Sequence, residues 1–230
     1  MLGALREQLK ALPVHQRQQV ITNISKLPDR EKVELIQLLS EIDKRTKRDA
    51  AQGGFLDFIK AVYPGYKIGN HHRRLANLLE EAVKGDKKRI IVNIAPRHGK
   101  SEMASYLFPA WFLGQYPDKK IIMATHTADL SVSFGRRVRD LVDSPDYREI
   151  FPSVKLNQDA KAAGQWNTSV GGQYYAVGVG GALAGRGADG FVIDDPHNEQ
   201  QEKTNNPTAF LPAWDWFQSG PLQRLMPNGI

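Results

Sequence analysis

The sequence contains no cysteine among its 230 residues. A disulfide framework is therefore excluded, as is any zinc or iron–sulfur site built on thiolate ligands. Long hydrophobic runs are also missing, because the longest are strand-sized, such as residues 90–95, whereas a membrane helix needs roughly 20 apolar residues. The opening stretch, MLGALREQLK, is polar and charged, so we expect no cleavable signal peptide and no membrane partner.

The proportion of charged residues is ordinary, but basic residues outnumber acidic ones. Charged residues make up 24% and hydrophobic residues 41% of the chain, which is usual for a globular protein, while the net charge is +6. Basic side chains gather in four places, a distribution that suits either a polyanionic partner such as nucleic acid or a solvated surface. The four clusters are residues 44–48, 71–74, 84–89 and 136–139.

Residues 1–50 differ in character from the rest of the chain. Leucines at helical spacing predict a short helix before Pro13, and Pro28-Asp29 opens a longer one. The stretch AAQGGF, residues 50–55, is typical of a hinge. We therefore predict an N-terminal helical arm or lid over residues 1–50 and a second domain over residues 51–230. The residues expected on one face of the longer helix are Val33, Ile36, Leu39 and Ile42.

Strand-like and helical patterns alternate within residues 51–230. This alternation predicts an α/β fold with a mostly parallel central sheet flanked by helices. In such sheets the ligand lies beyond the carboxyl ends of the strands. We expect a β-hairpin that turns at Gly171-Gly172. The expected strands are residues 90–95, 120–125 and 191–193, and the expected helices are residues 71–83, 99–113 and 127–143.

The stretch PRHGKSE joins the first of these strands to a helix, as a phosphate-binding loop does. Gly99 lets the backbone approach a phosphate, Lys100 reaches the β- and γ-phosphates, and Ser101 offers a hydroxyl to Mg²⁺. Ile94 replaces the first glycine of the usual pattern, and Gly-Lys-Ser also arises by chance, so the order strand, loop, helix carries the argument. The candidate nucleotide-binding residues are Pro96, Arg97, His98, Gly99, Lys100, Ser101 and Glu102.

Two carboxylates follow the strand at residues 191–193. Asp194 would hold Mg²⁺, and Asp195 would orient or deprotonate an attacking water. The alternative is a plain Asx-turn that ends a core strand. A metal-dependent hydrolase cluster of Asp194, Asp195, His197 and Glu199 is a further alternative, but one short turn cannot easily aim all four side chains inward.

Two arginines are candidates for stabilising phosphate charge. Arg97 lies inside the loop, where its guanidinium would reach a γ-phosphate. Arg186 is flanked by glycines in LAGRGADG, which suits an arginine finger that acts within the chain or on a neighbour. Either residue could instead be an exposed loop arginine.

Four stretches resemble the large terminase subunit of tailed bacteriophages. They are IIVNIAPRHGKSE, KKIIMATHTADLSVSFGRRVRDLV, GALAGRGADGFVIDDP and PLQRLMPNGI, and the resemblance covers residues 55–230. A loop with an arginine before His-Gly-Lys-Ser is typical of that family, so Ile94 is no objection. The resemblance implies a P-loop NTPase of the ASCE type that uses ATP and Mg²⁺ as a motor for translocating double-stranded DNA into a procapsid.

The resemblance also implies a role for individual residues. One departure is Asp195, because the family usually has a glutamate there, so Glu199 is a second candidate for the catalytic carboxylate. Residues 66–74 match the region that frames the adenine. The residues carried over by position are Lys100 and Ser101 of Walker A, Arg97 within that motif, Asp194 of Walker B, Arg186 as an arginine supplied to a neighbour, and Tyr66 and His71 at the base.

The implied partners are double-stranded DNA, the portal protein of the procapsid, the small terminase subunit and further copies in a homo-oligomeric ring. The place of action would be the cytoplasm of the infected bacterium, and we expect the isolated chain to be a monomer. The family's C-terminal nuclease domain is not among residues 1–230, so no nuclease activity is expected. The alternatives left open are another P-loop translocase or helicase, a P-loop kinase, and a non-catalytic module that docks on DNA or portal.

Overall fold

The computed structural model describes residues 28–198 and 207–230 of the chain. The chain divides into two units, Met1–Ala50 and Ala51–Ile230. The helix expected before Pro13 and the candidate carboxylate Glu199 lie outside the described residues. Within the described ranges, no helix combines the length and the hydrophobicity that crossing a membrane requires.

The described part of the first unit is the helix α3 (Asp29–Gly53), which also runs on into the second unit. Acidic residues in its first turn complement the positive end of the helix dipole. Its buried apolar residues are spaced as one stripe of a helix, but they differ partly from those expected, because Val33 and Ile36 are exposed. The buried residues are Leu35, Leu39 and Ile42.

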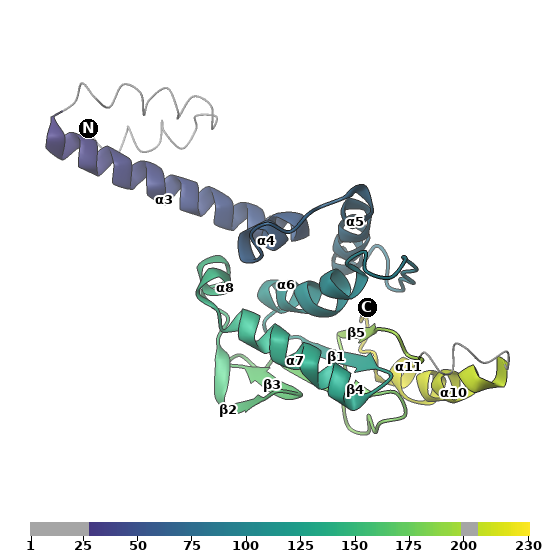
Figure 1. Cartoon of the computed structure of the whole chain (residues 1–230). Coiled ribbons are helices and arrows are strands. Elements are labelled where there is room, and N and C mark those ends of the chain that lie inside the picture. Colours follow the sequence, from purple (N-terminus) through teal and green to yellow (C-terminus); the bar gives the residue numbers. More distant parts are fainter. Residues whose placement is uncertain (1–27, 199–206) are drawn as a thin grey trace. The chain divides into compact units, whose positions relative to one another are not determined.

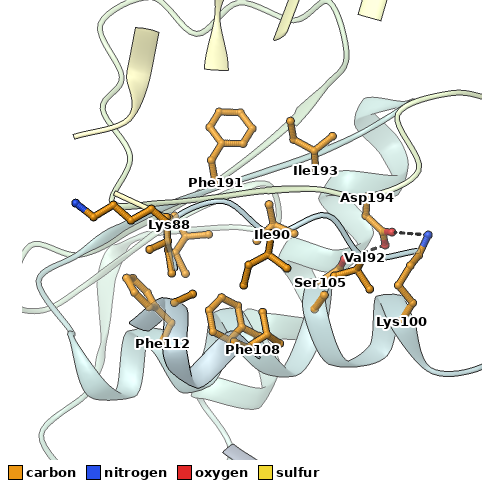
Figure 2. Close-up of a pocket in the computed structure, with 17 residues that line it drawn as sticks. Lys88, Ile90, Val92, Lys100, Ser105, Phe108, Phe112, Phe191, Ile193 and Asp194 are labelled. Atoms are coloured by element: carbon orange, nitrogen blue, oxygen red, sulfur yellow. Dashed lines mark hydrogen bonds and ion pairs between the residues drawn. The ribbon is translucent and has the colours of Figure 1, made fainter. Parts of the chain in front are cut away.

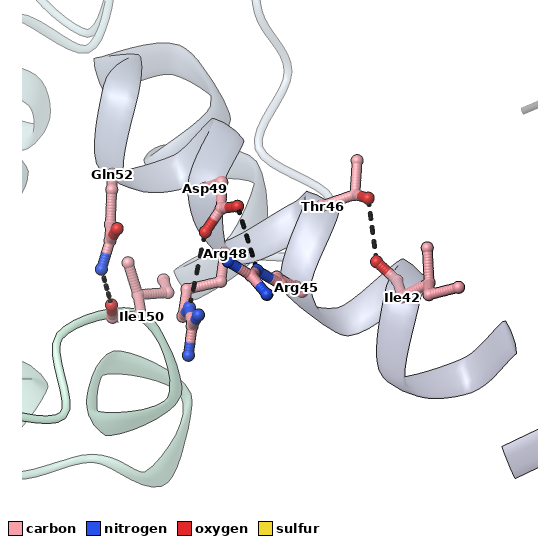
Figure 3. Close-up of polar contacts among 7 residues, drawn as sticks. All are labelled: Ile42, Arg45, Thr46, Arg48, Asp49, Gln52 and Ile150. Atoms are coloured by element: carbon pink, nitrogen blue, oxygen red, sulfur yellow. Dashed lines mark hydrogen bonds and ion pairs between the residues drawn. The ribbon is translucent and has the colours of Figure 1, made fainter. Parts of the chain in front are cut away.

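The segment at residues 50–55 is not the irregular hinge that its glycines predicted. The helix continues to Gly53, only Gly54 intervenes, and α4 (Phe55–Val62) follows at once. Alanine and glutamine favour helix, and Ala51 is completely buried, so packing and propensity together outweigh the glycines. Figure 3 shows the side chains along this helix: Thr46 Oγ1 donates to Ile42 O at 2.8 Å, and in the second unit Gln52 Nε2 donates to Ile150 O at 2.5 Å.

The second unit contains both helices and strands (Figure 1), but they do not alternate regularly, because the four strands after the first follow one another along the chain. The helix expected at residues 71–83 is confirmed as α5, and Gly85 ends it in the left-handed conformation, with φ 89°. The helices after α4 are α5 (Asn70–Lys84), the π-helix η2 (Glu102–Leu107), α6 (Phe108–Gln115), α7 (Ala128–Val142), α8 (Pro145–Ile150), the 3₁₀ helix η3 (Pro207–Phe210), α10 (Leu211–Ser219) and α11 (Pro221–Arg224).

Among the described residues, the sheet contains five strands in the order β2-β3-β4-β1-β5. β1 pairs in parallel with both β4 and β5, whereas the β2–β3 and β3–β4 pairs are antiparallel. The α/β class is therefore confirmed, with a mixed sheet, and so are the strand at residues 120–125 and the hairpin that turns at Gly171-Gly172. The strands are β1 (Lys120–Thr125), β2 (Leu156–Ala162), β3 (Gln165–Thr168), β4 (Gln173–Gly178) and β5 (Gly190–Ile193).

The main core is formed by buried residues of α4, α5, η2, α6, α7 and α8 together with residues of the sheet, and one part of it lies where α7 packs on the sheet. Trp166 and Tyr174 are completely buried and stack with ring centroids 5.1 Å apart. Trp166 Nε1 donates to the backbone oxygen of Gly135 at 3.1 Å, which ties the helix to the hairpin. A Cβ at Gly135 would lie 2.5 Å from Ala163 O, so only glycine permits this close approach. This packing fixes the sheet whose strand ends carry the candidate site.

Residues 90–95 form no strand, so the prediction made for them was wrong. Their side chains still alternate as in a strand, because Ile90, Val92 and Ile94 are half-buried while Ile91 is 98% exposed. A hydrophobic alternation needs a neighbouring strand to become part of a sheet. In the described part of the chain the sheet ends at β5, which is also only half-buried rather than the fully buried strand that was expected.

The helix expected at residues 99–113 is confirmed, and it ends at Gln115. Lys100 is its first helical residue, and the π-helix η2 interrupts the regular α-helical turn directly after the loop. π-helical turns are rare and occur frequently at functional sites. Here the irregular turn carries Ser105, a buried residue whose contact is described below.

Candidate functional site

The loop at residues 96–99 turns sharply before the helix begins. Arg97 and Gly99 both have positive φ, 64° and 78°, and glycine accepts this conformation without steric cost. His98 Nδ1 lies 2.8 Å from Pro96 O, and Met103 N donates to Gly99 O at 3.0 Å. The free amides at such a helix start carry partial positive charge, which is what an anion such as phosphate binds.

Two aromatic side chains cover the loop at Gly99. A Cβ there would lie 2.6 Å from both the hydroxyl oxygen of Tyr66 and Nε2 of His72. The Tyr66 hydroxyl is buried and has no hydrogen-bond partner among the residues that the structure describes. Burial, together with the nearby charge of Glu102, raises the pKa of Tyr66. This hydroxyl is a neutral donor that faces the loop.

His72 hydrogen-bonds to the loop, while the expected His71 packs on the loop's His98 ring with ring centroids 5.8 Å apart. His72 is buried, its Nε2 lies 3.0 Å from His98 O, and its Nδ1 accepts from the Gly69 amide at 3.0 Å. Burial lowers the pKa of His72 despite the hydrogen bond to His98, so the ring is neutral and Nε2 carries the proton. His71 is exposed beside it, with ring centroids 3.9 Å apart. The adjacent histidines are visible in the sequence, but the sequence does not indicate which of the two rings packs inward.

The close packing of Tyr66 and His72 on Gly99 leads to a first prediction. We expect Gly99→Ala to cost roughly 1–3 kcal/mol of stability and to weaken ATP binding, because the new methyl group meets Tyr66 and His72 and the positive φ is strained. Gly171→Ala is the matched control, since Gly171 also has a positive φ, 99°, but open space around it. Thermal unfolding and ATP titration would measure both. Equal ATP affinity in the two variants would contradict the close packing of Tyr66 and His72 on Gly99.

Lys100 contacts the two carboxylates that follow β5. Figure 2 shows its contact with Asp194. Its Nζ lies 3.4 Å from Asp194 Oδ1 and forms a shorter contact with Asp195 Oδ1. Burial lowers the pKa of Lys100, but the hydrogen bond and charge of Asp195 and the charge of Asp194 raise it by more, so the net shift is upward. The loop and the two acids were expected to lie together, and the structure places Lys100 in contact with both carboxylates.

The two carboxylates have different surroundings. Asp194 is only 7% exposed, and its amide donates to Ala124 O on β1 at 2.9 Å. The Asp195 side chain is 58% exposed, and its backbone has a positive φ of 42°. The amide of His126, just beyond β1, donates to Asp195 O at 3.2 Å. The ends of two parallel strands thus hold one buried and one solvent-facing carboxylate side by side.

Ser105 fixes the buried carboxylate from the other side. Its Oγ donates to Asp194 Oδ2 at 2.8 Å, so the two oxygens of Asp194 are held by different partners. Ser105 is completely buried in η2 (Figure 2). Ser105 was not among the residues predicted for the site, and its only signal in the sequence is a hydroxyl four positions after Ser101 in an otherwise largely apolar helix.

A second prediction concerns this hydroxyl. We expect Ser105→Ala to lower ATP turnover by about tenfold to 100-fold, because losing a hydrogen bond to a charged group costs roughly 1.5–3 kcal/mol and frees Asp194 to rotate. The Mg²⁺ concentration needed for half-maximal turnover should rise. Ser131→Ala is the control, since Ser131 is equally buried but donates to Val177 O, away from the acids. A loss of stability in both variants with unchanged turnover would contradict a positioning role.

The two candidate arginines lie in different surroundings. Arg97 is exposed within the loop. Arg186 does not contact the loop: its guanidinium lies 3.6 Å from the ring centre of Tyr175, and it donates to Gln165 Oε1 at 3.4 Å. These partners belong to β4 and β3. Within its own chain, Arg186 is therefore held against the sheet rather than at the Lys100 cluster.

Glu102, the last candidate of the loop, pairs with Arg137 of α7 at 2.6 Å. The same guanidinium lies 4.1 Å from the ring centre of Tyr106. These contacts link the start of the loop helix to α7. Glu102 thus supports the position of the loop helix through Arg137.

The donor atoms near Lys100 fit a magnesium ion shared with a phosphate. Mg²⁺ prefers oxygen ligands and usually takes only one or two carboxylates besides phosphates and water. Asp194 supplies a carboxylate and Ser101 a hydroxyl next to the loop. Residues 28–198 and 207–230 contain no group of three or more potential metal ligands. The hydrolase cluster is therefore not formed by Asp194, Asp195 and His197, and the His197 ring instead packs on Phe210 at 4.7 Å.

Comparison with known proteins gives one family. The family model described as "Terminase large subunit, T4likevirus-type, N-terminal" matches residues 91–207. No curated protein sequence matches the chain. The matched span is just over half of the chain and contains the loop, Ser105 and both carboxylates. The chain therefore belongs to the family of the N-terminal domain of large terminase subunits, which have a role in viral DNA packaging.

Proposed function

We propose that this chain is an ATP-hydrolysing motor domain with a P-loop fold of the ASCE type, which drives double-stranded DNA into a procapsid. One observation carries the proposal. Lys100, at the start of the loop helix, lies 3.4 Å from Asp194, at the carboxyl end of β5. A lysine that reaches phosphates and an acid that holds the metal are the two groups that a P-loop NTPase must bring together.

Different residues would bind the phosphates, the base and the metal ion of the nucleotide. The loop amides and Lys100 bind the β- and γ-phosphates, and the aromatic region of Tyr66 and His71 frames the base. Ser101 and Asp194 would hold Mg²⁺, which on binding neutralises phosphate charge. Lys100 must leave its contact with Asp195 to reach a phosphate, so nucleotide binding frees that carboxylate.

Asp195 is the proposed base. Its side chain is exposed, so water reaches it, and its left-handed backbone is the type of strained conformation that clusters at active sites. Once Lys100 has turned to the phosphates, Asp195 can accept a proton from the attacking water. Glu199, the other candidate, lies outside the described residues. Arg97 lies in the loop, from which its guanidinium would stabilise charge on the γ-phosphate.

We further propose that the chain acts as a homo-oligomeric ring on the portal protein, with the small terminase subunit as a partner, in the cytoplasm of an infected bacterium. The support is membership of the terminase family. In such a ring Arg186 would act on the neighbour's nucleotide, because in its own chain it is held against Tyr175 and Gln165.

Mg²⁺-dependent ATP turnover at several protein concentrations tests this function. We expect turnover to rise faster than linearly with concentration, because a neighbour's arginine completes the site, and we expect Arg186→Ala to remove that steep rise. The arginine of such sites contributes roughly 10³–10⁵ in rate. Lys60→Ala is the control, since Lys60 is an exposed lysine paired with Asp57 on α4. Linear turnover that is unaffected by Arg186→Ala would exclude a role in trans.

A further inference from the structure

Two hydrogen-bond donors pack against the phosphate loop at Gly99. A Cβ on Gly99 would lie 2.6 Å from His72 Nε2 and 2.6 Å from the hydroxyl oxygen of Tyr66, so both groups touch the loop backbone directly. His72 Nε2 lies 3.0 Å from His98 O and donates to it. The Tyr66 hydroxyl is buried and has no hydrogen-bond partner among the residues that the structure describes.

The Tyr66 side chain is held in place although its hydroxyl is unpaired. Its ring packs on the rings of His72 and Tyr63, with centroids 5.3 Å and 5.4 Å apart. Burial and the charge of Glu102 raise the pKa of Tyr66, so the hydroxyl keeps its proton and remains a donor. A buried donor without an acceptor destabilises the state in which it is unpaired. A second arrangement of the loop that supplies an acceptor would remove this destabilisation.

Arg97 O is the acceptor that the loop can supply. Among the described residues it has no donor, whereas the other carbonyl oxygens of residues 96–99 each have one. Those donors are the His98 ring for Pro96 O, the His72 ring for His98 O and the Met103 amide for Gly99 O. The backbone of Arg97 has a φ of 64°, which is strained for a residue with a Cβ. Strain of this kind is typical of segments that have two arrangements.

The direction of a carbonyl oxygen in the loop fixes the direction of the next amide. In a planar trans peptide group the C=O and the N–H point to opposite sides. Because His98 O points to His72, the Gly99 amide points away from His72, and successive amides aimed to one side form an anion site. If Arg97 O turned to Tyr66 in the same way, the His98 amide would join the Gly99 amide on that side.

We propose that Tyr66 is a positioning residue of the phosphate loop. When a nucleotide binds, the peptide group between Arg97 and His98 turns, so that Arg97 O accepts a hydrogen bond from the Tyr66 hydroxyl and the His98 amide donates to a phosphate oxygen. His72 and Tyr66 then hold two successive peptide groups of the loop. The inference rests on the proposed nucleotide site, and this role is additional to any contact of the Tyr66 ring with the base.

Tyr66→Phe in the full chain tests the proposal, because it keeps the ring and removes only the hydroxyl. Thermal unfolding is measured without nucleotide, and a non-hydrolysable ATP analogue is titrated in the presence of Mg²⁺. We expect the free variant to unfold at the same temperature as the unchanged chain or higher, because the lost hydroxyl has no partner there. We expect its affinity for the analogue to fall about threefold to tenfold, the effect of one hydrogen bond made only in the bound state.

Amide hydrogen exchange follows the turn of the peptide group itself. In the unchanged chain the analogue should slow exchange at both the His98 and the Gly99 amides. In Tyr66→Phe the Gly99 amide should still be protected, because His72 holds its peptide group, and the His98 amide should lose most of its protection. Tyr63→Phe is the matched control, since Tyr63 is an exposed tyrosine that packs on the Tyr66 ring, and it should behave as the unchanged chain.

Three outcomes would overturn the inference. If Tyr66→Phe binds the analogue as tightly as the unchanged chain does, the inference fails and the nucleotide site stands. If Tyr66→Phe unfolds several degrees lower without nucleotide, the hydroxyl is paired in the free protein and the inference again fails alone. If the unchanged chain binds no analogue, the proposed function and the inference fail together.

Discussion

Replacing Lys100 by alanine is expected to lower ATP turnover by about 100-fold to 1,000-fold, the cost of removing one preorganised charge from a transition state. The ammonium is the group that can move between the carboxylates and the phosphates, and in the structure it contacts both Asp194 and Asp195. Without it, two neighbouring carboxylates face an incoming polyanion. ATP affinity should therefore fall together with turnover, and both are measured by calorimetry and phosphate release.

The control for Lys100→Ala is Lys60→Ala, which removes an equal charge and an ion pair far from the loop in sequence. Its turnover should match that of the unchanged chain. Lys100→Ala should unfold at a temperature close to that of the unchanged chain, because a lost lysine on a partly exposed site costs little stability. If Lys100→Ala retained its affinity for ATP, the loop would not be the phosphate site.

Asp194→Asn is expected to have the second large effect. The substitution keeps the shape of the side chain and an oxygen for Ser105, but it removes the charge that would hold Mg²⁺. We expect turnover to fall by roughly 100-fold, equivalent to about 3 kcal/mol, and we expect the need for Mg²⁺ to shift to higher concentration. Turnover measured over a range of Mg²⁺ concentrations separates this effect from a loss of ATP binding.

Asp189→Asn provides the matched control at the other end of β5. Asp189 also pairs with a lysine, Lys119, at 3.0 Å, and accepts from the Lys120 amide at 2.9 Å, so its substitution tests the structural cost of the change alone. Its turnover should remain close to normal at every Mg²⁺ concentration. An equal loss in both variants would mean that Asp194 acts by supporting the sheet.

The elements with a clear period were predictable from the sequence. β1 was predicted at its observed bounds because an apolar run is enclosed by turn residues, and α7 was predicted because its apolar residues repeat every three to four positions. The hairpin around Gly171 followed from alternation and paired glycines. In each case the local pattern and the tertiary packing favour the same structure.

The remaining features depend on contacts that a local pattern does not contain. Residues 90–95 alternate as a strand does, but pairing requires a neighbour, and beyond β5 the described sheet has none. The glycines at 53 and 54 suggested an irregular segment, but α3 runs to Gly53 and only Gly54 separates it from α4. Likewise, the choice between His71 and His72 is made by the hydrogen bonds of His72 to Gly69 and His98.

The main residues of the candidate site were predictable from the sequence, but several of their contacts were not. Lys100, Asp194 and Asp195 were expected together because ligands bind where parallel strands end, and the structure places them in contact. Ser105 was missed because its role depends on the π-helical turn that aims it at Asp194. The position of Arg186 on Tyr175 was also not readable from the flanking glycines.

The measurement that most directly tests the central claim is calorimetric titration of the chain with a non-hydrolysable ATP analogue, with and without Mg²⁺. The account predicts one saturable site per chain in the presence of Mg²⁺, and weaker binding when the metal is removed. Lys100→Ala should abolish the heat of binding, and Lys60→Ala should leave it unchanged. No binding to the unchanged chain at millimolar analogue would contradict the account and would favour a non-catalytic module that docks on DNA or portal.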